Sequence, residues 1–210
     1  IVQTGTGGVA QLNAIGGAVA VNRGTLLSIT VKSYIGENND YMNGNGTNVD
    51  IQVLLRKNYS IGGVVGHNYN QVTFCDNYAS IGASDSFGGI VGLNFEGAVI
   101  KNCTNYGDMW YQMISNGQNQ SGGIVGTVRD RGFLYKCVNY GTITFALKTT
   151  SNALDIQYLA NIAGAACTTA SFNECESYGN VVIADGILLS TIQSQGVKTN
   201  KDAIGFYFTI

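Results

Sequence analysis

The chain has 210 residues and a net charge of -2, and only 11% of its residues are charged, compared with about 25% in an average soluble protein. Because it contains no basic run, it lacks the electrostatic footprint that nucleic-acid binding requires, and no stretch approaches the roughly 20 apolar residues of a membrane-spanning helix. Proline is absent, which favours a backbone whose N–H groups are nearly all used by neighbouring strands.

Three regions follow along the chain. Residues 1–14 are a lead-in or cap rich in glycine and threonine, and the start at Ile1 indicates a mature product or a segment of a longer protein. Residues 15–182 hold internal repeats. Residues 183–210 are expected to form terminal strands or a second cap, and the apolar alternation over 203–210 predicts a last strand that either caps the stack or docks further protein. We therefore expect a single domain.

A phrase is repeated five times: a glycine-flanked apolar run, a turn, and then Cys-x-(Asn/Ser)-Tyr. The runs lie at residues 16–20, 62–66, 88–92, 122–126 and 162–166, and the endings lie at 75–78, 103–106, 137–140 and 175–178, with Val31 and Tyr34 closing the first copy. Such self-similarity is typical of stacked repeats that cannot bury their apolar face alone. Short runs rich in β-branched residues predict an all-β fold, a parallel β-solenoid (β-helix) of about five coils with loops inserted on one side.

Aligning the copies on the cysteine predicts which columns face inward. They are the column three residues before the cysteine (Val72, Ile100, Leu134 and Phe172), the tyrosine three residues after it, and the column six residues after it (Ile81, Met109, Ile143 and Val181). Val31 and the four thiols of Cys75, Cys103, Cys137 and Cys175 are expected to form one buried column, because valine can replace a thiol that acts as a small hydrophobe. Parallel side-chain vectors disfavour disulfides between neighbouring coils, and no Cys-x2-Cys pair suggests zinc. Cys167 stands where other copies have glycine.

Three asparagines two residues after the cysteine also recur in register. Because asparagine tolerates a left-handed backbone, we predict that they are turn residues between short strands: Asn77, Asn105 and Asn139.

Two sets of residues are candidates for catalysis. His67, the only histidine, is aligned with Val21, Leu93 and Thr127, so the scaffold does not demand it, and no Gly-x-Ser-x-Gly elbow accompanies it. Glu96 and Asp130 both lie seven residues before a cysteine and should be neighbours on one turn. They could form a glycosidase pair or part of a calcium site. Alternatively, the arginines that flank Asp130 neutralise a solvated turn.

Two segments are candidates for binding. Residues 37–50 are rich in oxygen ligands, so calcium is a possible ligand, but their spacing does not match known calcium loops and a flexible polar loop is the simpler interpretation. Trp110 and Tyr111 lie in a variable region, where exposed aromatic rings could stack on a carbohydrate or protein partner. The alternative is that Met109, which belongs to an inward column, holds them under a loop.

The phrase Gly-Gly-Ile-Val-Gly followed by Asn-Cys-x-Asn-Tyr-Gly resembles the GLUG-motif repeat of bacterial surface and secreted proteins, including regions of IgA-specific metallopeptidases outside the catalytic domain. The resemblance is best over residues 88–107 and 122–141. It implies a spacer or adhesive segment at a cell surface and brings no active-site residues with it.

The sequence therefore predicts a non-enzymatic adhesin, spacer or assembly module, located outside the cell or on a bacterial surface. Its expected partners are proteins, carbohydrates or further copies of itself through terminal strands, with no cofactor and no metal. Two alternatives remain: a polysaccharide-active β-helix lyase or hydrolase, and a self-assembling filament subunit.

Overall fold

The computed structural model describes residues 14–32, 51–53, 60–83, 86–113, 120–147, 156–183, 193–196 and 206–209. Within these ranges all the regular elements are β-strands, β1 to β27. The strands are only two to five residues long, as expected where short apolar runs alternate with glycine and polar turn residues. The predicted all-β class is confirmed.

Five coils follow one another, and each passes through five strands in the same order. The strands of coil 1 are β1 Ala14–Gly16, β2 Val19–Asn22, β3 Thr25–Leu27, β4 Thr30–Val31 and β5 Ile51–Val53. Those of coil 2 are β6 Ser60–Gly62, β7 Val65–Asn68, β8 Gln71–Thr73, β9 Asp76–Asn77 and β10 Ile81–Ala83. Those of coil 3 are β11 Ser86–Gly88, β12 Val91–Asn94, β13 Val99–Lys101, β14 Thr104–Asn105 and β15 Met109–Met113.

Coils 4 and 5 repeat this path. The strands of coil 4 are β16 Gln120–Gly122, β17 Val125–Val128, β18 Phe133–Tyr135, β19 Val138–Asn139 and β20 Ile143–Leu147. Those of coil 5 are β21 Ile156–Ala160, β22 Ala163–Ala166, β23 Ser171–Asn173, β24 Glu176–Ser177 and β25 Val181–Ile183. Strands β26 Gln193–Gly196 and β27 Phe206–Thr209 follow the last coil.

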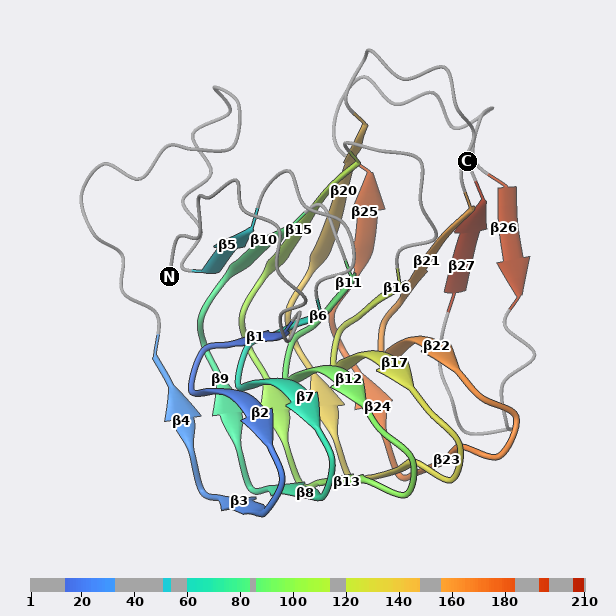
Figure 1. Ribbon diagram of the computed structural model, residues 1–210. Helices are drawn as coiled ribbons and strands as arrows, with labels where there is room; N and C mark the ends of the chain where they lie inside the picture. The colour runs from blue at the N-terminus through green and yellow to red at the C-terminus, as the bar shows by residue number, and fades with distance from the viewer. Residues whose placement is uncertain are drawn as a thin grey trace, which may run out of the picture.

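Each strand of coils 1 to 4 pairs in parallel with the strand five places later, so equivalent strands form five sheets around the stack (Figure 1). We call the sheets B, C, D, E and A in the order in which a coil passes through them; they begin with β1, β2, β3, β4 and β5 respectively. The registers are consistent from coil to coil: Val72, Ile100 and Leu134 are direct partners on sheet D. The molecule is a parallel β-solenoid of five coils, as predicted.

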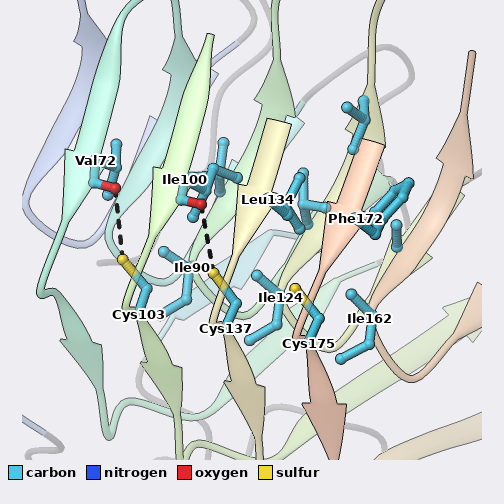
Figure 2. Packing of buried hydrophobic residues seen from close by; sticks show 14 of the residues in the cluster. Val72, Ile90, Ile100, Cys103, Ile124, Leu134, Cys137, Ile162, Phe172 and Cys175 are labelled. Atoms are coloured by element: carbon cyan, nitrogen blue, oxygen red, sulfur yellow. Dashed lines mark hydrogen bonds between the residues drawn. The ribbon is translucent and has the colours of Figure 1, made fainter. Parts of the chain in front are cut away.

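One apolar cluster lies between sheets C and D and the corner that leads to sheet E, and further buried apolar residues such as Ile81, Phe87 and Met109 lie on sheets A and B. One row of β-branched residues from the turn between sheets B and C faces the thiols and the large apolar residues of sheet D, as Figure 2 shows for Ile90, Ile124 and Ile162. In coils 2 to 4 these residues are fully buried. The predicted columns three residues before the cysteine and six residues after it are both confirmed by the register.

The thiol column is confirmed for the four cysteines but the prediction for Val31 is wrong. Val31 pairs with Asn77, and the residue equivalent to Cys75 is Ile29, whose carbonyl accepts the N–H of Asp76. The reason is the turn between sheets C and D, which has two residues in coils 1 and 2 and four in coils 3 to 5. Val31 follows its glycine pair at the same distance in sequence as Cys103 and Cys137 do. Because the turn of coil 1 is two residues shorter, the residue in the cysteine column of coil 1 lies two positions earlier, at Ile29.

The prediction for the recurrent asparagines is also wrong. Asn77, Asn105 and Asn139 lie in strands of sheet E and their side chains are fully buried. In each coil a left-handed residue stands instead at the corner between sheets D and E, directly before the cysteine column, with φ between 50° and 56°: Ser28, Phe74, Asn102, Lys136 and Glu174. The corner accepts five different residue types, which is why the sequence does not reveal it.

Glycines of the repeated phrase bring sheets B and C into direct backbone contact. A Cβ atom on Gly92 would lie 2.6 Å from the backbone nitrogen of Ile61 and 2.8 Å from the carbonyl oxygen of Gly66. Real Cβ atoms do not approach backbone atoms so closely, so this position requires glycine. Close packing of two backbones, and not turn conformation, explains this part of the repeat.

Variable connections between the coils lie on one side of the solenoid. In coils 2, 3 and 4 they join a strand of sheet A to the next strand of sheet B, over residues 84–85, 114–119 and 148–155. Figure 1 shows that these strands end and begin at the same side of the stack. The turns that join sheets B, C, D and E vary less: they have two residues each, apart from the four-residue turn between sheets C and D in coils 3 to 5.

The C-terminal strands extend sheet B. β27 pairs antiparallel with β21 on one side and with β26 on the other, so both of its edges are used. The sequence left two roles for residues 203–210, capping the stack or docking further protein. The pairing of β27 favours the cap, because this strand covers the edge of β21.

Candidate functional site

The carboxylates of Glu96 and Asp130 lie on neighbouring turns between sheets C and D. The N–H of Gly97 donates to the carbonyl of Asp130 at 2.9 Å, which places the two turns in register as expected. Glu96 forms an ion pair with Arg131, and both side chains are largely exposed. Asp130 accepts a hydrogen bond from the Thr169 hydroxyl at 3.1 Å. Each carboxylate thus has its own partner on a solvated turn.

His67 lies on sheet C among aromatic rings. Its ring is edge-on to Phe95 at 5.3 Å, and Phe95 stacks on Tyr69 at 3.9 Å. Only 9% of His67 is exposed, and its Nδ1 atom has no hydrogen-bond partner among the described residues. Burial lowers the pKa of His67, because the charged imidazolium loses its hydration. The aligned residues Val21, Leu93 and Thr127 are confirmed by the register.

We expect the stability of the protein to fall in acid because of His67. Since its pKa is lower in the folded state, the neutral form is favoured there, and stability is lost as the pH falls through the unfolded value near 6.5. The loss is about 1.4 kcal/mol for each unit by which the pKa is lowered. Urea unfolding between pH 7.5 and 5 measures it.

The control is His67→Leu, which copies the residue at this position in the next coil, Leu93. Because the chain has a single histidine, this variant should lose the slope of stability with pH between 7 and 5.5. An unchanged slope would show that another group causes the acid sensitivity.

Trp110 lies on the outer face of sheet A. Met109, its neighbour in β15, pairs with Ile81 and Ile143 and is buried, whereas Trp110 pairs with Gly82 and Thr144 and is half-buried. For Tyr111 the structure gives the backbone pairing with Ala83 and Phe145, and its side chain lies outside the described part.

The four thiols of the core lie in one row along the stack, and each donates a hydrogen bond to a backbone carbonyl. Cys103 donates to the carbonyl of Lys101 at 3.2 Å and Cys75 to that of Thr73 at 3.3 Å. Figure 2 shows the sulfur atoms of Cys103, Cys137 and Cys175 in line along the stack. Burial raises the pKa of Cys137, and the hydrogen bond to Cys103 together with burial raises the pKa of Cys75. All five cysteines are free.

We expect these thiols to be unreactive in the folded protein, because a thiolate is the reactive form and these sulfurs are inaccessible. A maleimide should label the half-buried Cys167 first, and Cys75, Cys103, Cys137 and Cys175 only after unfolding. Mass spectrometry of the labelled peptides measures the order. Rapid native labelling at Cys103 or Cys137 would contradict the buried row.

Buried asparagines form a ladder along the stack at sheet E. The amide of Asn77 donates to the side-chain oxygen of Asn105 at 2.8 Å, and Asn105 donates to Asn139 at 2.9 Å. Each also bonds the backbone two residues later; Asn105 donates to the carbonyl of Gly107 at 3.0 Å. In this way every polar atom of a buried amide is used.

A second ladder of this kind lies at the corner between sheets C and D. Asn22 donates to Asn68 at 2.9 Å and Asn68 to Asn94 at 2.7 Å. It ends where coil 4 has Val128. Stacked amides therefore tie successive coils together at two corners of the solenoid.

A tyrosine ladder runs along the outside of the same sheet E. Tyr78, Tyr106, Tyr140 and Tyr178 are 42–62% exposed. Their rings are stacked with successive centroid separations of 4.5, 5.2 and 5.1 Å and interplanar angles of at most 13°. Tyr178 donates to Glu176 at 2.6 Å, which raises the pKa of its hydroxyl. This is the largest exposed aromatic feature of the described residues.

Sequence reasoning grouped these tyrosines with the inward columns. The signal that could have corrected it is strand alternation: if Asn77 faces inward, then Tyr78 faces outward. The period of three between Val72, Cys75 and Tyr78 was misleading, because the left-handed corner at Phe74 breaks the alternation between the two strands.

Among the described residues, no group of three or more His, Cys, Asp or Glu side chains is placed to hold a metal ion. No helix in that part of the chain is long and apolar enough to cross a bilayer. The candidate calcium segment, residues 37–50, lies outside the described residues.

Comparison with known proteins gave no match to a protein-family model, a curated protein or a solved structure.

Proposed function

We propose that this chain is a non-enzymatic repeat domain that acts as a spacer or adhesive segment of an extracellular or bacterial-surface protein. The observation that carries this proposal is that the repeated side chains contact their equivalents in the next coil along the solenoid axis. The asparagines and tyrosines that the repeat supplies are partnered by their equivalents in the next coil, and the thiols pack in one row along the stack. These residues build a rod, and the resemblance to GLUG-motif repeats agrees with such a role.

The geometry at Glu96 and Asp130 favours this function over the enzymatic alternative. A glycosidase pair needs two carboxyl groups that face a common substrate. Here Glu96 is held by Arg131 and Asp130 by Thr169, on an exposed turn. An acidic polysaccharide would also require a basic groove, and the chain has only 11 lysines and arginines.

A turnover assay tests the proposal. The purified chain is incubated with neutral and uronic-acid polysaccharides, and reducing ends and unsaturated products are measured. The matched control is the double variant Glu96→Gln/Asp130→Asn. We expect the same background with both proteins. Product formed by the natural chain and lost in the double variant would establish an enzyme instead.

The adhesive role is tested separately at Trp110. Binding to immobilised glycans and to cell surfaces is measured for the natural chain and for Trp110→Ala, with Val182→Ala as the control, because Val182 is exposed and stands in the same outward column of sheet A. If the chain adheres through the indole of Trp110, we expect Trp110→Ala to bind at least tenfold more weakly and Val182→Ala to bind like the natural chain. Equal binding by all three would exclude Trp110 as the contact and leave the spacer role.

A further inference from the structure

The tyrosine ladder holds four phenol rings at a short and fixed spacing on the surface. The backbone N–H of Tyr106 donates to the carbonyl of Asn77 at 2.8 Å, and that of Tyr140 donates to the carbonyl of Asn105 at 2.7 Å. Each tyrosine is therefore anchored to the coil before it. The ring separations of 4.5, 5.2 and 5.1 Å match the coil spacing of about 4.8 Å. The carbon atoms ortho to one hydroxyl thus lie beside those of the next ring.

Phenol rings that are held in this way are arranged for oxidative coupling. A phenol that loses one electron and its hydroxyl proton becomes a phenoxyl radical, and part of the unpaired spin lies on the ortho carbons. Two such radicals combine through these carbons. Because the ladder holds the two rings side by side, their encounter becomes an intramolecular step with a high effective concentration.

We propose that the tyrosine ladder is a site of oxidative modification, at which dityrosine bonds join neighbouring coils and reinforce the solenoid. The candidate pairs are Tyr78–Tyr106, Tyr106–Tyr140 and Tyr140–Tyr178. The modification requires a one-electron oxidant of the kind that a haem peroxidase forms from hydrogen peroxide. This inference goes beyond the proposed spacer or adhesive role and does not depend on glycan binding.

The coupling step balances in electrons and protons. The oxidant removes one electron from each of two rings, and each phenol releases its hydroxyl proton. The proton of Tyr178 passes to Glu176, whose carboxylate accepts its hydrogen bond at 2.6 Å, and the protons of the other rings pass to water. One carbon–carbon bond then forms between two ortho carbons. The hydrogens that these carbons carried move to the two oxygens, which restores both phenols, so the net change is the loss of two hydrogen atoms.

The surroundings of the rings favour the ladder over two other tyrosines of the described chain. The ladder rings are exposed, so an oxidant in solution can reach them. Tyr69 stacks on Phe95, and Tyr135 stacks on Phe133. Since phenylalanine has no hydroxyl group to lose a proton, neither of these stacked pairs can form dityrosine.

Dityrosine bonds should make the solenoid harder to unfold. A bond between Tyr78 and Tyr106 ties coil 2 to coil 3 and closes the loop of chain between them. Cross-links of this kind stabilise a protein mainly because they restrict its unfolded chain. We therefore expect the oxidised protein to unfold at a higher urea concentration than the same protein before oxidation.

Photo-oxidation tests the proposal, with ruthenium(II) tris(bipyridine), light and persulfate as the source of the one-electron oxidant. Cys167 is half-buried, so it is first blocked with a maleimide, because an accessible thiol would reduce the phenoxyl radicals. Dityrosine fluorescence measures the yield, and tandem mass spectrometry of tryptic peptides locates each bond. We expect most of the dityrosine in the three ladder pairs of single chains, with a yield that does not fall when the protein is diluted.

Tyr106→Phe is the variant that tests the site, because phenylalanine keeps the stacked ring and lacks the hydroxyl group. Tyr106 belongs to two of the three pairs, so we expect the loss of both bonds and of at least half of the yield. The bond between Tyr140 and Tyr178 should remain. The matched control is Tyr135→Phe, which removes a hydroxyl group outside the ladder and should leave the yield and the bonds unchanged.

Each of the opposite results would overturn the proposal. They are dityrosine located mainly outside the ladder, dityrosine formed mainly between chains with a yield that falls on dilution, a yield that Tyr106→Phe leaves unchanged, and a urea midpoint that does not rise on oxidation. The turnover and adhesion assays use the protein before oxidation, so failure of this proposal and failure of the proposed function can be distinguished.

Discussion

Gly92→Ala is expected to destabilise the protein by about 3 kcal/mol or more, the upper range for overpacking of a rigid core. The added methyl group would lie 2.6 Å from the nitrogen of Ile61, 2.7 Å from the carbonyl carbon of Ser60 and 2.8 Å from the carbonyl oxygen of Gly66. All three are backbone atoms of neighbouring strands, so no side chain can rotate away. Sheets B and C would have to separate. Urea unfolding monitored by circular dichroism measures the loss.

Gly24→Ala is the matched control. A Cβ atom on Gly24 would meet nothing within 4 Å. The same change of residue type should therefore be neutral or stabilising by up to about 1 kcal/mol, because alanine restricts the unfolded chain. Equal effects of the two variants would refute the close contact between sheets B and C.

Asn105→Ala is expected to cost about 3–5 kcal/mol, since it interrupts the middle of the asparagine ladder. The substitution removes the acceptor of one N–H of the Asn77 amide, whose other N–H still donates to the carbonyl of Ala79, and it removes the donor that Asn105 gives to the side-chain oxygen of Asn139. The carbonyl and the N–H of Gly107 also lose their side-chain partner. Each buried polar group left unpaired costs about 1–3 kcal/mol, although Gly107 N–H keeps a second acceptor in the carbonyl of Asn77.

Asn173→Ala serves as the comparison, because Asn173 is exposed on sheet D and lies outside both asparagine ladders. We expect a change within about 0.5 kcal/mol there. Hydrogen exchange of the Gly107 amide adds a local measurement: it should accelerate in Asn105→Ala and not in Asn173→Ala. An Asn105→Ala protein as stable as the control would show that the ladder contributes nothing.

The repeats predicted the fold, because matching residues at a constant spacing must occupy the same position around each coil, and few folds other than a stacked solenoid allow this. Apolar runs that are too short for helices, together with recurrent Cys75, Cys103 and Cys137, were sufficient to predict five stacked coils and most inward columns. The position of His67 opposite Leu93 and of Glu96 beside Asp130 also followed from the alignment.

Details that depend on backbone conformation could not be predicted. The two additional residues at the turns of coils 3 to 5 shifted the alignment of coil 1, so that Ile29 and not Val31 stands in the cysteine column. The left-handed corner before Cys75 reverses which side chains face inward, and it is occupied by residues as different as Phe74 and Lys136. For this reason Asn105 was expected in a turn, and the tyrosine ladder was expected to face inward.

The sulfur positions test the central claim, that matching phrases stack in register. An anomalous difference map from a crystal of the natural chain should show the sulfurs of Cys75, Cys103, Cys137 and Cys175 in one straight row with successive separations near the coil spacing of about 4.8 Å, and Cys167 apart from them. Sulfurs that are scattered over different faces, or joined in pairs at bonding distance, would contradict the stacked solenoid described here.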